Sequence, residues 1–231
     1  ITVQKEDMMP SQNIIKRILK ISVPSVSGRL IGNVAFFLEP IILTNMLLLF
    51  GYTNTYVLEE YASYNAYAIG LLTIPSFFIS AICQILIPEI SKYHGQKNVS
   101  MIKRRLSQAL FYSFVIGFCS SMILFFFRNI LLSVIYNTTR GSEYIFALAP
   151  FFVFFYLEAP LSSALQALDE SKKAMQITLY GSILKLLIMA ILCCFKIGLY
   201  ALVISEVLNI LFVVYLNARS VHQSIKKIQL A

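Results

Sequence analysis

Five charged side chains interrupt long apolar stretches of the sequence, and their chemistry stands out from their surroundings. They are two cations and three carboxylates: Arg29, Lys185, Glu39, Glu158 and Glu206. A charge at the centre of a bilayer costs at least about 2.5–3.5 kcal/mol, so such residues normally face a protein interior or a hydrated cavity and find partners. These five are the candidate functional residues.

Four of the five are expected in one layer of the membrane. Counting about 1.5 Å per residue from the cytoplasmic end of each expected helix places four of them about 12–15 Å deep. The exception is Glu39, which is expected apart from the others, about 27 Å up and next to Pro40. Two interpretations remain open. The four charges form a neutral ion-paired plug that fixes helix packing, or they line a hydrated cavity where Arg29 and Lys185 meet an anionic group.

The composition around these charges predicts a membrane protein. Of 231 residues, 58% are hydrophobic and 13% are charged, whereas a soluble domain is about 45–50% apolar and about 25% charged. These values exclude disordered chains, collagens, nucleic-acid-binding tails and disulfide scaffolds. No segment alternates with the period of two that a transmembrane barrel requires. We therefore expect an all-α, polytopic membrane helix bundle.

Six segments are long enough to cross a bilayer, which takes about 20 helical residues. They are residues 21–48, 62–89, 107–127, 143–167, 176–195 and 199–216. A basic cytoplasmic segment, residues 1–20, precedes this six-helix unit of residues 21–217, and a cytoplasmic tail, residues 218–231, follows it. Because the chain starts at Ile1 rather than Met, it is read as a possible fragment.

The basic residues predict the orientation. Of nineteen Lys and Arg, fourteen fall in the first segment, in two alternate loops and in the tail, and three fall on the opposite side: Arg128, Arg140 and Lys196. Cytoplasmic loops carry the excess of basic residues, so both termini are expected in the cytoplasm. The net charge of +8 therefore indicates topology and contact with anionic membrane lipids, not nucleic acid.

Enzyme motifs are absent from the sequence. No phosphate-binding loop, zinc-protease, nucleophile-elbow or dinucleotide-binding motif occurs. The histidines, His94 and His222, are far apart, and the four cysteines lack metal-ligand spacing. We expect no enzyme, no cofactor and no metal. Any transport would draw on an ion gradient, the membrane potential or the substrate's own gradient.

Six of the seven prolines lie in the expected helices, two in each of three. They are Pro24, Pro40, Pro75, Pro88, Pro150 and Pro160. Proline removes a backbone hydrogen bond and tends to kink a helix. Membrane helices tolerate proline, so these residues are either ordinary membrane-helix prolines without a functional role or hinges for alternating access.

Five short segments carry a family resemblance. They are residues 22–32 (SVPSVSGRLIG), 38–42 (LEPII), 85–91 (ILIPEIS), 161–168 (LSSALQAL) and 181–186 (GSILKL). Their order and spacing, from about residue 15 to residue 217, resemble the seventh, eighth, tenth and eleventh helices of stage V sporulation protein B-like flippases. This family belongs to the multidrug/oligosaccharidyl-lipid/polysaccharide exporter superfamily.

The resemblance implies a fold of two six-helix lobes, of which this chain is the second. The partners would be the missing N-terminal six-helix lobe, membrane lipids and a lipid-linked saccharide. The implied function is movement of undecaprenyl-linked sugars, including peptidoglycan precursors, to the outer leaflet of the bacterial cell membrane. Arg29 and Lys185 would then offset the pyrophosphate charge. The lipid II flippase branch has charge in its eighth helix, whereas residues 62–88 have none, which favours a sporulation-type or general polysaccharide flippase.

Two alternatives remain. A cation-coupled multidrug exporter of the same superfamily would use Glu39, Glu158 and Glu206 for cationic cargo. A non-transporting membrane scaffold in envelope assembly would use the charges for assembly and show no flux.

Overall fold

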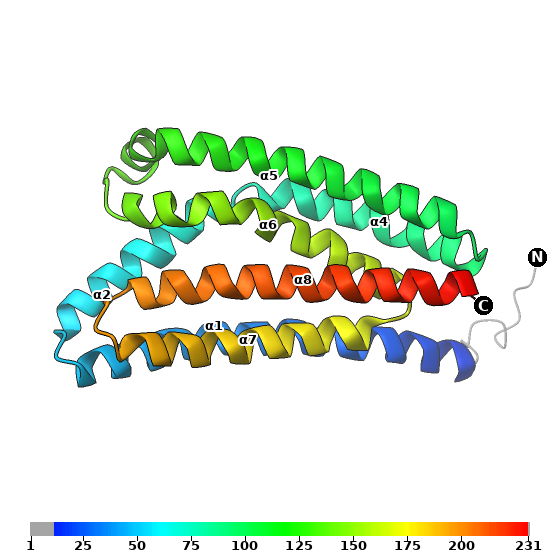
Figure 1. Cartoon of the computed structure of the whole chain (residues 1–231), viewed down its shortest axis with the longest axis horizontal. Helices are drawn as coiled ribbons and strands as arrows, with labels where there is room; N and C mark the ends of the chain where they lie inside the picture. The colour runs from blue at the N-terminus through cyan, green and yellow to red at the C-terminus, as the bar shows by residue number, and fades with distance from the viewer. Residues whose placement is uncertain (1–11, 231) are drawn as a thin grey trace, which may run out of the picture.

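The computed structural model describes residues 12–230, and Figure 1 shows an elongated bundle of helices packed side by side. The elements are α1 (Gln12–Leu49), α2 (Asn54–Ala62), the π-helix η2 (Ser63–Ile69), α3 (Gly70–Thr73), α4 (Ser76–Gly95), α5 (Val99–Tyr136), α6 (Ser142–Ala167), α7 (Ser171–Cys193) and α8 (Tyr200–Leu230). The predicted all-α class is confirmed.

Five helices are individually long and apolar enough to cross a membrane: α1, α5, α6, α7 and α8. Two consecutive parts, Asn54–Thr73 and Ser76–Gly95, pass the same test together, and counting them as one crossing gives six. Several helices extend beyond the expected spans. The helix α1 begins at Gln12 instead of residue 21, and α7 begins at Ser171 instead of residue 176.

The broken crossing bends by 49° at Ile74 and Pro75. Because proline has no N–H, it interrupts the helical hydrogen-bond ladder here. The hydroxyl of Tyr156 on α6 donates to the backbone carbonyl of Leu72 and so supports the chain beside the bend. The other five prolines of the expected spans lie inside continuous helices. Of the six predicted kink positions, Pro75 is therefore the one where the structure breaks a helix.

The helices α1 and α7 pack side by side and run in the same direction. A Cβ added at Gly28 would lie 3.4 Å from Cα of Met175, and one added at Gly32 would lie 4.0 Å from Cγ2 of Thr178. The two helices thus advance in step along their length. In Figure 1 they lie along one side of the bundle, with α4 and α5 along the other and α6 and α8 between them. The start of α1 and the end of α8 lie at the same end.

Glycines allow two of the helix crossings to be close. A Cβ at Gly181 of α7 would lie 2.4 Å from Cγ2 of Val213 on α8, and a Cβ at Gly117 of α5 would lie 2.5 Å from Cδ2 of Tyr156 on α6. Small residues bring helix backbones together in membrane proteins, where packing replaces the hydrophobic driving force. The contact at Gly181 fixes the position of α8 against α7, beside the charged residues described next.

Candidate functional site

Three of the five candidate residues form a buried ion-paired cluster, the triad of Glu39, Lys185 and Glu206. The ammonium of Lys185 on α7 pairs with the carboxylates of Glu39 on α1 and Glu206 on α8. The side chains of Glu39, Lys185 and Glu206 are 3%, 16% and 13% exposed, respectively. One cation therefore joins three helices that are separate in the sequence.

The expected isolation of Glu39 is wrong. Because α1 and α7 run parallel and in step, a residue on α1 lies at the height of its neighbour on α7, and Glu39 is level with Lys185. The expected depths were counted from helix ends that differ from the real ones. Arg29 precedes Glu39 by ten residues on α1, which is about 15 Å along the helix. Arg29 and Lys185 therefore lie in different layers.

The other two candidates, Arg29 and Glu158, line two adjoining cavities. The first, of about 280 Å³, is lined by Glu158 together with Ser76 and Ser80 of α4. The second, of about 260 Å³, is lined by Arg29 together with residues of α1, α6 and α7. Ser162 and Gln166 of α6 line both cavities. We call the two together the polar groove.

The groove is built from side chains four residues apart on apolar helices. The stripe on α6 is Glu158, Ser162 and Gln166, and the partner pair on α1 is Ser25 and Arg29. Residues at this spacing share one helix face. The hydroxyl of Ser25 donates to Oε1 of Gln166 at 3.5 Å, which links the two stripes.

Glu158 also interacts with the triad through charge. Its carboxylate and that of Glu206 on the neighbouring helix α8 repel each other electrostatically. The groove and the triad are therefore distinct in their contacts but coupled through this pair. Within residues 12–230, no group of three or more His, Cys, Asp or Glu side chains is arranged to hold a metal ion.

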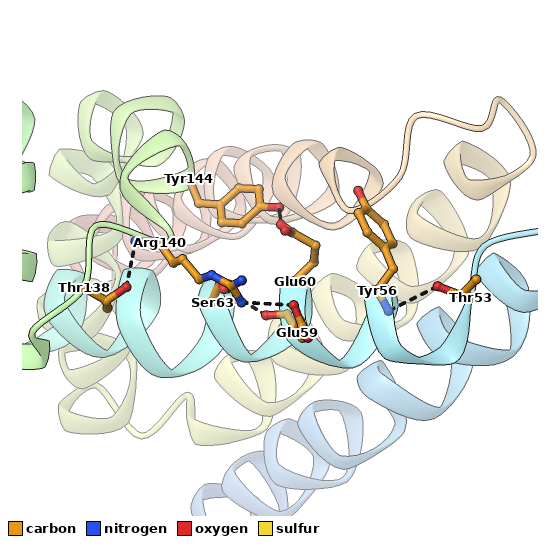
Figure 2. Close-up of polar contacts among 8 residues, drawn as sticks. All are labelled: Thr53, Tyr56, Glu59, Glu60, Ser63, Thr138, Arg140 and Tyr144. Carbon is orange, nitrogen blue, oxygen red and sulfur yellow. Dashed lines mark hydrogen bonds and ion pairs between the residues drawn. The ribbon is translucent and has the colours of Figure 1, made fainter.

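A second polar cluster lies at the end of the bundle formed by the α1–α2 and α5–α6 loops. Figure 2 shows this loop-end cluster, in which Nη1 of Arg140 lies 3.0 Å from Oε2 of Glu59 and the Tyr144 hydroxyl donates to Glu60. The Arg140 and Glu59 side chains are 64% and 54% exposed. Its carboxylates are occupied by protein partners, so the cluster attaches α2 to the start of α6.

A protein family with a matching sequence model identifies the kind of protein that contains this triad and polar groove. The family model described as lipid II flippase MurJ matches residues 11–231, nearly the whole chain. The chain belongs to the MurJ lipid II flippase family. The resemblance to flippases of this superfamily is thereby confirmed, and the chain is a multi-pass membrane protein.

Two curated relatives of this MurJ-family chain are sporulation proteins of Bacillus subtilis (strain 168). Stage V sporulation protein B is 31% identical over 206 residues, which are 89% of this chain and 40% of the relative. Sporulation protein YkvU is 23% identical over 189 residues, 82% of this chain and 42% of the relative. The chain therefore spans less than half the length of these relatives.

Solved structures of MATE transporters share the fold. A MATE in the bent conformation matches with a TM-score of 0.85 at 15% identity, covering 99% of this chain and 50% of that one. An outward-facing multidrug resistance MATE transporter of the MOP superfamily matches with a TM-score of 0.83 at 16% identity, covering 100% and 51%. The six-crossing bundle thus has the fold of half of such a transporter, as predicted.

Proposed function

We propose that this chain is the C-terminal lobe of a flippase that moves undecaprenyl-linked saccharides to the outer leaflet of the bacterial cell membrane by alternating access. The cargo would be a peptidoglycan or polysaccharide precursor, and the protein would move it without chemical change. Membership in the lipid II flippase family and the match to half of each MATE structure support this proposal. An N-terminal lobe of the same protein would complete the pathway.

The observation that carries the proposal is the polar groove. Its one cation, Arg29, is exposed on α1 and has a guanidinium suited to bidentate contact with a pyrophosphate. The amide of Gln166 and the serine hydroxyls beside it both donate and accept hydrogen bonds, which suits the hydroxyls of a sugar. A polar headgroup passing here avoids bare hydrocarbon, where its unpaired polar groups would be costly.

The residues of the triad take a different role in this proposal. Lys185 is held by two carboxylates and is therefore not free to bind an anionic headgroup. Glu39, Lys185 and Glu206 would instead hold α1, α7 and α8 together beside the pathway. Glu158, which lines the cavity of the groove next to that of Arg29, would orient the headgroup through hydrogen bonds to sugar hydroxyls.

The orientation follows from the positive-inside rule. Basic residues at the end of α4 and the starts of α5 and α7, such as Lys92, Arg104 and Lys172, lie at the end of the bundle where α1 begins and α8 ends. We propose that this end is cytoplasmic and that the loop-end cluster faces outward. Cargo would enter the groove at the end nearer Arg29.

The test is flipping of fluorophore-labelled lipid II by the full-length protein in proteoliposomes. Arg29→Gln should lower the rate roughly ten- to hundredfold at limiting substrate, because a hydrogen bond to a charged group contributes about 1.5–3 kcal/mol. Arg29→Lys should retain part of the activity. The matched control is Arg104→Gln, an exposed arginine in α5 outside the groove, which should flip at the wild-type rate.

Wild-type flipping by Arg29→Gln would refute the role of the groove. The multidrug alternative predicts the opposite charge dependence. If Glu158→Gln abolishes export of a cationic dye while Arg29→Gln leaves it intact, and lipid II is not flipped by the wild type, the cargo is a cation.

A further inference from the structure

The triad contains more acidic groups than basic ones. Two carboxylates share one ammonium, so with all three groups ionised the cluster carries one excess negative charge among helices that cross the membrane. Burying a charge that has no counter-ion is among the most unfavourable arrangements in a protein interior. A cluster that bound one proton would be neutral, with one carboxylate paired to Lys185 and one carboxylic acid beside it.

Groups on the neighbouring elements do not cancel the negative charge of the triad. Glu158 on α6 interacts with Glu206, and Tyr61 on α2 interacts with Glu39 and Lys185. Tyr64, on η2, interacts electrostatically with both Glu206 and Glu39. Each of these neighbours is either neutral or negatively charged, so none supplies the missing positive charge.

The hydroxyl of Tyr64 is a second, independent indication that a polar group is missing beside the triad. Its side chain is only 2% exposed, and its hydroxyl has no hydrogen-bond partner in the described part of the chain. Buried hydroxyls are nearly always hydrogen-bonded, and an unsatisfied one calls for an explanation. The π-helix η2, a conformation that is frequent at functional sites, holds this residue in place.

We propose that Glu39, Lys185 and Glu206 form a site that binds and releases one proton. The proton comes from water and returns to water, and no other bond changes. The two carboxylates share the proton, and Glu206 is the one that a reagent in solution reaches, because 13% of its side chain is exposed against 3% for Glu39. Release of the proton adds a negative charge at the junction of α1, α7 and α8, and therefore alters how firmly α1 is held.

The proton site goes beyond the proposed function, and it is tested without any cargo. The reagent is N,N′-dicyclohexylcarbodiimide, which modifies protonated carboxyl groups in apolar surroundings. The full-length protein in detergent is treated in choline-based buffers from about pH 6 to about pH 9, and the modified glutamates are located by mass spectrometry. Glu206 should be modified at the low end, and its modification should fall about tenfold per pH unit once the site loses its proton.

The decisive variant is Glu39→Gln, read at Glu206. In this variant Glu206 becomes the sole carboxylate beside Lys185, the charges balance, and Glu206 should remain ionised. Its modification should therefore fall at least about tenfold at every pH. The matched control is Glu170→Gln, which removes a carboxylate that pairs with Lys173 outside the triad and should leave modification of Glu206 unchanged.

A second variant, Lys185→Gln, tests the proposal if Glu39→Gln does not fold. In Lys185→Gln, two carboxylates remain without a cation, so modification should persist to a higher pH than in the wild type. The proposal is overturned if Glu206 is unmodified at every pH while its peptide is detected. It is also overturned if modification in Glu39→Gln equals that in the wild type, or if Lys185→Gln has the wild-type pH profile.

Discussion

Replacing Lys185 by Met removes the cation of the triad while keeping an unbranched side chain. The carboxylates of Glu39 and Glu206 would then face each other with 3% and 13% of their side chains exposed. No other cation interacts with Glu39 in the described residues. We expect Lys185→Met to destabilise the folded protein strongly, and we expect neutralisation of both carboxylates to restore most of the loss.

The expected magnitude follows from the burial of the three groups. Breaking a buried ion pair by removing one partner costs about 3–5 kcal/mol, whereas replacing all the charges by neutral residues is often without penalty. For a domain of about 150–250 residues, 1 kcal/mol changes the melting temperature by about 2–4 °C. Lys185→Met should therefore lower it by about 6–20 °C. The combination with Glu39→Gln and Glu206→Gln should recover most of that difference.

The assay is thermal unfolding of the full-length protein in detergent at about pH 9, the upper end of the range tested above, where proton binding by the two carboxylates relieves the least of the lost pairing. The control is Lys173→Met, which removes a pair whose partners are 31% and 30% exposed. Such a surface pair is worth about 0–1 kcal/mol, so the control should shift by less than about 4 °C. The reasoning fails if Lys185→Met melts within about 2 °C of the wild type, or if the triple variant melts as low as the single one.

Three further predictions concern packing and the polar contacts around the site. Gly181→Ala should melt about 2–12 °C below Gly32→Ala, because overpacking at the α7–α8 crossing costs about 1–3 kcal/mol while both substitutions gain the same helix propensity. Equal melting temperatures would contradict the close crossing. Tyr156→Phe should lose about 0.5–1.5 kcal/mol in the same unfolding assay, since its hydroxyl supports the carbonyl beside the bend. An unchanged stability would show that this bond contributes nothing. Arg140→Gln should cost less than about 1 kcal/mol, because its pair with Glu59 is exposed, and the difference should disappear in about 1 M salt. A loss that persists at high salt would mean that Arg140 acts through packing.

The helices were predictable from the sequence because each apolar run is a local signal. The runs at residues 107–127 and 143–167 fall within α5 and α6, and the helical fold of one lobe followed from six such runs. The helix ends were less predictable. The helices α1 and α8 continue well outside the apolar spans, to Gln12 and Leu230, and hydropathy alone does not mark where a helix with polar side chains ends.

The triad could not be predicted, because a depth counted along one helix does not say which helix lies beside it. The pairing of Glu39 with Lys185 depends on the parallel packing of α1 and α7 and on their register, which no local pattern contains. The polar groove, in contrast, corresponds to a recognisable pattern in the sequence. Polar residues recur every fourth position from Glu158 to Gln166 in an otherwise apolar helix, and that spacing marks one face.

The pairing of Lys185 changes what the flippase proposal requires of the whole protein. A pyrophosphate carries more negative charge than Arg29 alone can balance, and Glu158 in the same groove adds another negative charge. With Lys185 held by two carboxylates, the remaining positive charge would have to come from the proposed N-terminal lobe. Selection of the cargo would then be shared between the two lobes. In this proposal the triad would instead regulate how the three helices beside the groove are held, and its state would follow the proton and not the cargo.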